Sequence, residues 1–169
     1  SWNYPEPNNV NQVLNMTNGD ADLGLSINPT IDGNTMDITI EVKFGIDYSL
    51  AELSLVVYVL EDDLFSNQEN YTSYYGGASV LTNFEHDHVL RASLTDLLGD
   101  PIPQSSTTAD NIFTQTITTN VPSNVSNSDN LSVVAFVVNA SGNGTPGSSN
   151  QAINVRSAHF GDTQTLQEL

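Results

Sequence analysis

The chain has 169 residues, a length that suits one domain with a substantial core. Only 3 lysines and arginines stand against 20 aspartates and glutamates, giving a formal net charge of -17 at pH 7. This acidity excludes DNA, RNA and anionic membrane surfaces as partners, because phosphate groups are bound by cationic side chains. The sequence has no cysteine, which excludes disulfides, zinc–thiolate sites, thiol nucleophiles and a lipidated cysteine within these residues.

Apolar runs are short throughout the sequence. None reaches the roughly 18 residues that a membrane-spanning helix needs, so we expect no membrane insertion by this chain. The sequence starts without Met and without a signal peptide, which is typical of a mature product or an excised domain.

The periodicity of the apolar residues predicts strands. Residues 1–18 contain two prolines and several asparagines without a sustained period, and we expect a linker or extended edge segment there, ahead of a domain at 19–169. In the domain the apolar residues recur with a period of two, most clearly over 36–46. The runs 53–60 and 131–138 are apolar on both faces and are predicted to be central strands. The predicted strands cover residues 21–27, 36–46, 53–60, 84–92, 112–119, 131–138 and 152–160.

Turn residues separate these runs, and no segment has the pattern of an amphipathic helix. Gly19-Asp20, Asp32-Gly33 and the stretch 141–149 are typical spacers. About seven alternating strands in this length predict an all-β protein, an antiparallel β-sandwich of immunoglobulin or fibronectin-III type.

Two histidines form the first candidate site. His86 and His88 are two apart in the predicted strand 84–92, so both side chains would leave one face, about 7 Å apart. Such a pair can chelate Zn²⁺, Cu²⁺ or Ni²⁺ when a third ligand joins, for which His159 and the acidic residues 61–63 are candidates. The rest of that face is apolar, and this favours a structural, hydrogen-bonded role for the histidines.

Three carboxylates in a row form the second candidate site. Glu61, Asp62 and Asp63 follow a predicted buried strand, where crowded carboxylates repel one another unless a cation lies between them. The favoured interpretation is an ordinary solvated loop. If an ion binds, calcium is preferred over Zn²⁺, because calcium prefers such oxygen ligands. No EF-hand loop is present in the sequence.

Two further clusters concern binding and stability. Tyr71, Tyr74 and Tyr75 flank two glycines in a long predicted loop and are the candidate ligand-binding residues, since exposed tyrosines stack on sugars or anchor protein interfaces. A structural role, in which the tyrosines pin that loop to the sandwich, is the favoured interpretation over binding. Arg91 alternates with Glu85 and Asp87, and we expect a structural ion pair among these three residues.

The segment from residue 53 to residue 91, together with a later strand, resembles a known family. It reads LVVYVLEDD at 55–63, then Asn67-Gln68, then HDHVLR at 86–91, and VVAFVVN follows at 133–139. This order is similar to the C-terminal β-sandwich region of the Omp28-related outer membrane proteins of the Bacteroidetes, over roughly residues 37–160. Where that family often has Gly after the Glu-Asp pair, this chain has Asp63. The resemblance implies a secreted or surface-exposed binding or accessory module.

No nucleophile elbow and no phosphate-binding loop are present in the sequence, so we do not expect an enzyme. The expected function is a non-catalytic extracellular or outer-membrane-surface module that acts in adhesion, in binding a protein or glycan, or as a structural accessory. One alternative is a calcium-stabilised carbohydrate-binding module that uses the tyrosine loop. Another is a self-assembling surface or filament subunit in which residues 1–18 add as a strand to a neighbour's sheet.

Overall fold

A computed structural model describes Asn11, residues 21–139 and residues 151–169. Apart from Asn11, the predicted linker at 1–18 lies outside the described residues, as does the whole of the predicted turn region at 141–149. Within the described residues, no helix has the length and apolarity to cross a bilayer.

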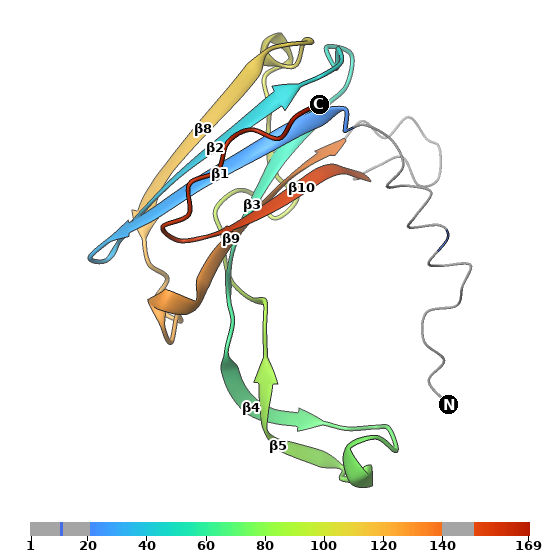
Figure 1. The fold of residues 1–169 in the computed structure, drawn as a ribbon, viewed down its shortest axis with the longest axis vertical. Helices are drawn as coiled ribbons and strands as arrows, with labels where there is room; N and C mark the ends of the chain where they lie inside the picture. Colours follow the sequence, from blue (N-terminus) through green and yellow to red (C-terminus); the bar gives the residue numbers. More distant parts are fainter. Residues whose placement is uncertain (1–10, 12–20, 140–150) are drawn as a thin grey trace.

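Antiparallel strands make up two main sheets and a separate hairpin (Figure 1). The first sheet has the order β1-β2-β8, with β1 at Leu23–Asp32, β2 at Thr35–Phe44 and β8 at Ile112–Asn120. The second has the order β10-β9-β3-β6, with β10 at Gln151–His159, β9 at Leu131–Asn139, β3 at Leu53–Glu61 and β6 at Val89–Ser93. The short β7 (Asp100–Pro101) also pairs with β3, and β4 (Leu64–Glu69) pairs with β5 (Val80–His86). The 3-10 helices are Tyr75–Gly77, Gln104–Ser106 and Ser128–Asn130.

The core lies between the two main sheets, as the alternation of the sequence predicts. Every second residue of β2, from Met36 to Phe44, is fully buried. The two runs that are apolar on both faces become β3 and β9, which are neighbours in the middle of the second sheet. The predicted all-β antiparallel sandwich is therefore confirmed, while the finer likeness to immunoglobulin or fibronectin-III domains stays a prediction.

The predicted strand at 84–92 is wrong. The strand is interrupted between His86 and Val89. Its first part, β5, belongs to the separate hairpin, and its second part, β6, belongs to the second main sheet. Together with the unpredicted β4 and β7, this raises the strand count above the expected seven. The predicted strand 36–46 also ends early, at Phe44, and Ile46 beyond it is 46% exposed.

The two edge strands of the first sheet differ. The last residues of the chain run along the outer edge of β1, as Figure 1 shows. The side-chain oxygens of Gln167 and Gln164 accept hydrogen bonds from the N–H groups of Leu25 and Ile27, both at 3.0 Å. The N–H of Gly161 donates to the carbonyl of Pro29 at 2.8 Å. This segment, residues 161–169, is called the C-terminal tail below.

The same tail also contacts the second sheet. The side chain of Arg156, on β10, donates to the carbonyls of Leu25 and Thr165, and the amide of Gln164 donates to the carbonyl of Ser157 at 2.7 Å. The side of the sandwich formed by β1 and β10 is thus closed by hydrogen bonds of the tail.

Close packing at Gly24 makes the role of the tail testable. A methyl group added there would meet the carbonyl oxygen of Gln167 at 2.7 Å, so Gly24→Ala should displace the tail from β1. We expect a loss of about 1–3 kcal/mol in the free energy of unfolding. We also expect faster amide exchange at Leu25, measured by NMR. The control Gly33→Ala lies in open space at a φ of +59°. It should cost stability through the turn and leave the exchange at Leu25 unchanged; equal exchange in both variants would contradict the role of the tail.

Candidate functional site

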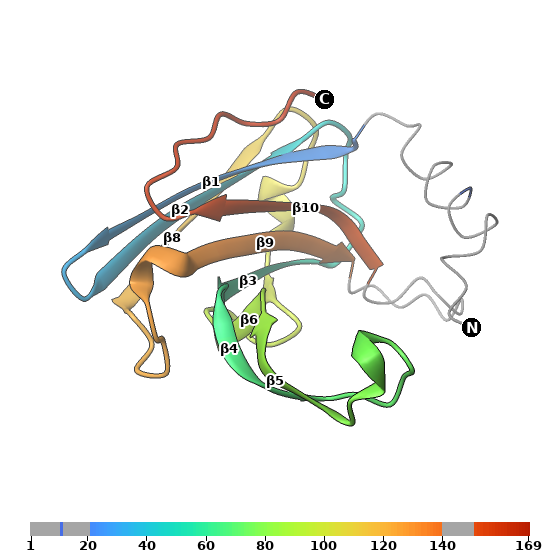
Figure 2. The same cartoon turned by 60° about the horizontal axis from the view of Figure 1, so that its bottom comes forward.

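The hairpin formed by β4 and β5 stands away from the sandwich and is called the arm below. Figures 1 and 2 show it leaving the ends of β3 and β6 and curving below the second sheet. None of its strand residues is buried. A two-stranded hairpin alone is marginally stable in water, so the local contacts at its base and tip decide its conformation.

Two short connections join the arm to the sandwich, Asp62–Asp63 and Asp87–His88, and together they are called the neck. Each connection binds the other: the carboxylate of Asp62 accepts from the N–H of His88 at 2.6 Å, and that of Asp87 accepts from the N–H of Asp63 at 3.1 Å. Asp63 and His88 have φ angles of 58° and 57°, in the left-handed region that favours glycine. Both connections of the neck therefore pass through a backbone conformation that non-glycine residues rarely adopt.

A buried ion pair lies directly under the neck. Alternation along β3 turns Glu61 inward, where its side chain is fully buried. Nε of Arg91, on β6, donates to Oε2 of Glu61 at 2.6 Å, and the N–H groups of Ser126 and Asn127 donate to Oε1 at 2.8 and 2.6 Å. Three segments of the chain are thus joined at one carboxylate: β3, β6 and the loop before β9, which contributes two consecutive N–H groups.

The ionisation of Glu61 follows from these contacts. Burial by itself raises the pKa of the carboxyl, but the Asn127 N–H, the Arg91 guanidinium and the Ser126 N–H together outweigh it. The net result is a pKa below the ordinary glutamate value. Glu61 is therefore a charged, fully hydrogen-bonded structural group.

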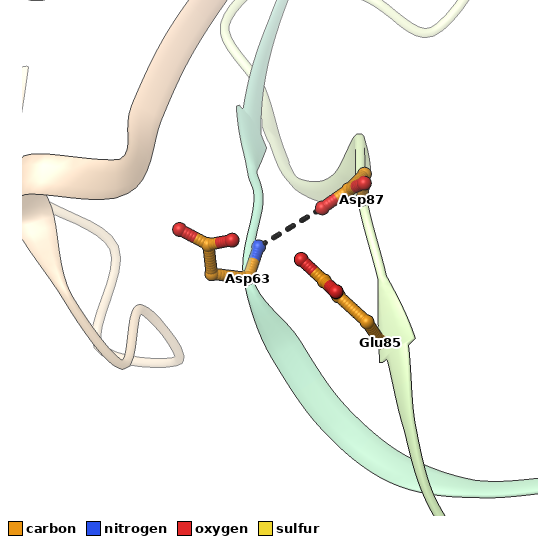
Figure 3. Close-up of side chains that lie close together, drawn as sticks. All are labelled: Asp63, Glu85 and Asp87. Carbon is orange, nitrogen blue, oxygen red and sulfur yellow. Dashed lines mark hydrogen bonds between the residues drawn. The ribbon is translucent and has the colours of Figure 1, made fainter.

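Three exposed carboxyl groups converge on the neck: Asp63, Glu85 and Asp87 (Figure 3). One oxygen of each lies within 4.8 Å of the others, as required for ligands of a single cation. A hydrogen bond with Asp63 and the negative charge of Asp87 raise the pKa of Glu85. Like charges held this close disfavour ionisation, and a bound Ca²⁺ would relieve their repulsion.

The tip of the arm is organised by Asn70. Its side-chain amide donates to the carbonyls of Tyr74 and Ala78 at 3.0 and 2.9 Å, and its side-chain oxygen accepts from Thr72 N–H and Oγ1. The backbone then turns through left-handed residues at 75–77. The tip is therefore held in one conformation by its own hydrogen bonds.

Exposed aromatic side chains gather on the arm. Tyr71 is 91% exposed, Tyr75 68% and Phe65 56%. Tyr75 packs edge-on against Phe84, with ring centroids 6.1 Å apart. The rings of Phe65, Tyr75 and Phe84, together with nearby strand residues, line an open hollow of about 560 Å³. Residues that line it include Phe65, Tyr75, Val80, Asn83, Phe84 and Glu85.

The structure places the predicted tyrosines at the tip of the arm but adds partners that the sequence did not indicate. Phe65 and Val80 sit on strands without an alternating pattern, and Asn70 resembles many other asparagines of the chain. Phe84 was the only hollow-lining ring in a predicted strand. Tyr71 donates from its hydroxyl to Glu69 at 3.1 Å, beside the hollow rather than lining it.

The predicted histidine pair is wrong in its geometry. His86 ends β5, whereas His88 follows the strand with a left-handed backbone, so they do not share the face of one strand. The ring of His86 packs against Phe84 with centroids 5.2 Å apart, and its Nε2 is buried without a partner among the described residues. Neither histidine belongs to a group of three or more candidate metal ligands in the described parts of the chain.

The predicted carboxylate triplet and ion-pair partners also need correction. Glu61 points into the core, Asp62 binds the backbone of His88, and of the triplet only Asp63 reaches the exposed carboxyl cluster. Arg91 pairs with Glu61 instead of Glu85 and Asp87, because it lies on β6 and these two precede the break. The candidate cation ligands thus come from both connections of the neck and from the end of β5.

Fold and site define an antiparallel β-sandwich domain with a projecting aromatic arm. A family model described as "Outer membrane protein Omp28" matches residues 3–164, so the chain belongs to the Omp28 family. The predicted family is confirmed, and with it a location at the outer-membrane surface. No curated protein matches the chain.

Two solved structures from Porphyromonas gingivalis share the fold. HBP35 is 20% identical with a TM-score of 0.64 over 95% of this chain and 49% of that one. A domain of the outer membrane lipoprotein Omp28 is 17% identical with a TM-score of 0.50, over 84% of this chain and 90% of that one. The chain therefore spans about half the length of HBP35.

The buried ion pair generates a stability prediction. Arg91→Ala leaves the carboxylate of Glu61 buried without its cation, so we expect a loss of about 3–5 kcal/mol in the free energy of unfolding at neutral pH, measured with urea. Arg156→Ala is the control, since the guanidinium of Arg156 donates to backbone carbonyls and not to a buried carboxylate.

The same pair has a pH signature. Because the pKa of Glu61 is lower in the folded than in the unfolded chain, its contribution is present above the unfolded pKa and is lost as the pH falls through the folded pKa. The wild-type chain should therefore lose stability on acidification more steeply than Arg91→Ala. Parallel pH curves for the two proteins would contradict this assignment.

Proposed function

We propose that the chain is a non-catalytic binding module of the outer-membrane surface, and that the arm is its contact surface. The observation that carries this proposal is the set of large aromatic side chains exposed around the hollow. Exposed aromatic groups of this kind are enriched at protein interfaces and in ligand sites, since each offers a large contact area.

Preorganisation of the arm supports the proposal. The bonds of Asn70 fix the tip, the edge-on contact with Phe84 orients Tyr75, and the reciprocal bonds of the neck fix the base. A ligand that docks on such a surface orders few side chains, so less of its interaction energy is lost to conformational entropy.

A cell-surface binding assay tests the proposal. Labelled wild-type chain and Tyr75→Ala are added to intact bacterial cells, and bound protein is measured by flow cytometry. We expect about a tenfold or greater loss of apparent affinity for Tyr75→Ala, because a central aromatic anchor is removed. Val155→Ala removes an exposed apolar side chain of β10, away from the arm, and should bind as the wild type does. Equal binding of all three proteins, or none, would contradict the arm as the contact surface.

A glycan is the ligand class that the hollow favours. Rings of Phe65, Tyr75 and Phe84 can stack on sugar faces, while the side chains of Asn83 and Glu85 beside them can bond sugar hydroxyls. A panel of immobilised glycans, probed with the same variants, separates this ligand class from a protein ligand of the cell surface.

We further propose that Ca²⁺ binds the carboxyl cluster of the neck and holds the arm in place. The convergence of Asp63 and Asp87 from the two connections with Glu85 from β5 is the observation that favours this ion.

Thermal melts test the calcium proposal. Calcium at about a hundred times its dissociation constant should raise the melting temperature by about 5–10 °C over the value in EDTA, and zinc should not. Asp87→Asn keeps an oxygen for the N–H of Asp63 but removes the charge, so it should abolish the rise. Glu168→Gln, a charge removed from the C-terminal tail, should retain it. A flat melt of the wild type would refute the site.

A further inference from the structure

The first sheet has a second edge strand, β8, which the tail does not reach. Figure 1 shows β8 as the outermost strand on the side of that sheet opposite β1. It is nine residues long, pairs with β2 along its whole length, and contains no charged residue and no proline. Long, flat and uncharged edges are the ones that pair with another strand, and natural proteins usually block them.

The backbone register tells which groups of β8 face outward. At its two ends, the N–H of Phe44 donates to the carbonyl of Asn111 and the N–H of Val121 donates to the carbonyl of Asn34. Antiparallel pairing alternates, so the odd-numbered residues of β8 bond to β2 and the even-numbered ones point their N–H and C=O away from it. Among the described residues, only one of these outward backbone groups has a hydrogen-bond partner: the side-chain amide of Gln115 donates to the carbonyl of Thr116.

The opposite edge shows how this chain blocks a strand. On β1 the odd-numbered residues point their N–H and C=O groups outward. The tail bonds to three of them, Leu25, Ile27 and Pro29, and the amide of Asn154 on β10 donates to the carbonyl of Leu23. Pro29 also fits there at no cost in ladder bonds, because its missing N–H would have pointed outward. The same sheet therefore has one edge covered by the tail and one edge that the tail leaves open.

We propose that the β8 edge binds the β8 edge of a second copy of this chain, forming one antiparallel sheet across a two-fold axis. Charge selects this occupant: two chains of net charge -17 repel each other, and residues 112–120 are an uncharged stretch along which they can approach. Pairing centred on Thr116 places Thr114 opposite the partner's Thr118 and Ile112 opposite the partner's Asn120. In this register the outward N–H and C=O groups of one copy lie opposite the outward C=O and N–H groups of the other, so the edge is self-complementary.

Sedimentation velocity over a range of concentrations tests the proposal with a matched pair of variants. Thr116→Pro removes the outward N–H in both copies, as Pro29 does on β1, and should raise the dissociation constant of the dimer about tenfold or more through the loss of two hydrogen bonds. Thr116→Val keeps the N–H and the β-branched shape, and its dimer should persist. Circular dichroism and melting of both variants verify that each is folded. A wild-type chain that stays monomeric, or a dimer that Thr116→Pro leaves intact, overturns the proposal.

A charge pair tests the register itself. In Thr114→Glu/Thr118→Lys each copy would place opposite charges across the interface, whereas Thr114→Lys/Thr118→Lys places like charges there. Within one chain Thr114 lies opposite Glu41, so the second variant should be the more stable monomer and still the weaker dimer. Dimer strength that follows monomer stability instead would exclude this register and, with it, the proposed pairing.

Salt gives an independent signature. Raising the ionic strength screens the repulsion of the two acidic bodies but leaves the uncharged strand pairing intact, so the dimer should tighten with salt. A dimer held by ion pairs would weaken under the same change, and that result would contradict the proposal.

Discussion

The carboxylate of Glu61 is the point on which the rest of the structure depends. It is fully buried, and it can remain charged there only because Arg91 and two backbone N–H groups surround it. These contacts fix the ends of β3 and β6 and the loop before β9 relative to one another. The neck begins one residue later, so the direction in which the arm leaves the sandwich follows from the same ion pair. A binding surface at the tip of the arm is oriented through this buried group.

Burial, more than strand formation, is what the sequence pattern predicts. The runs that became β2, β3 and β9 were recognised because their apolar side chains enter the core on one or both faces. The strand β4, with the sequence LFSNQE, has no buried residue, so its sequence has no alternating pattern and predicts a loop. The predicted strand 84–92 is wrong because its alternation of side chains continues through His88. The strand ends there because the backbone of His88 is left-handed, and the alternation does not show this.

The site shows a similar division. The tyrosines were predicted from chemistry alone and do lie at the exposed tip. Three consecutive acidic residues, however, end in three environments, because a strand turns successive side chains to opposite sides and the neck then reverses the chain. The partners of Glu61 include N–H groups 65 and 66 residues away, and backbone donors leave no trace in side-chain identity. Such contacts become visible only when the topology brings distant segments together.

Arm and open edge lie on different sheets, so ligand binding and self-association do not compete for one surface. A pair joined through β8 would carry two arms, one on the second sheet of each copy, with the two copies held together by one continuous first sheet. Two weak contacts to a repetitive surface ligand would then act together, with the second binding event made intramolecular. In the proposed pairing, the covered edge and the bare edge of the first sheet have different consequences. Closing both edges would keep the module monovalent, and opening both would let copies add without limit into a filament. With one edge covered, assembly stops at a closed pair, and this pair gains avidity. The two acidic molecules then contact each other only along the uncharged strand β8.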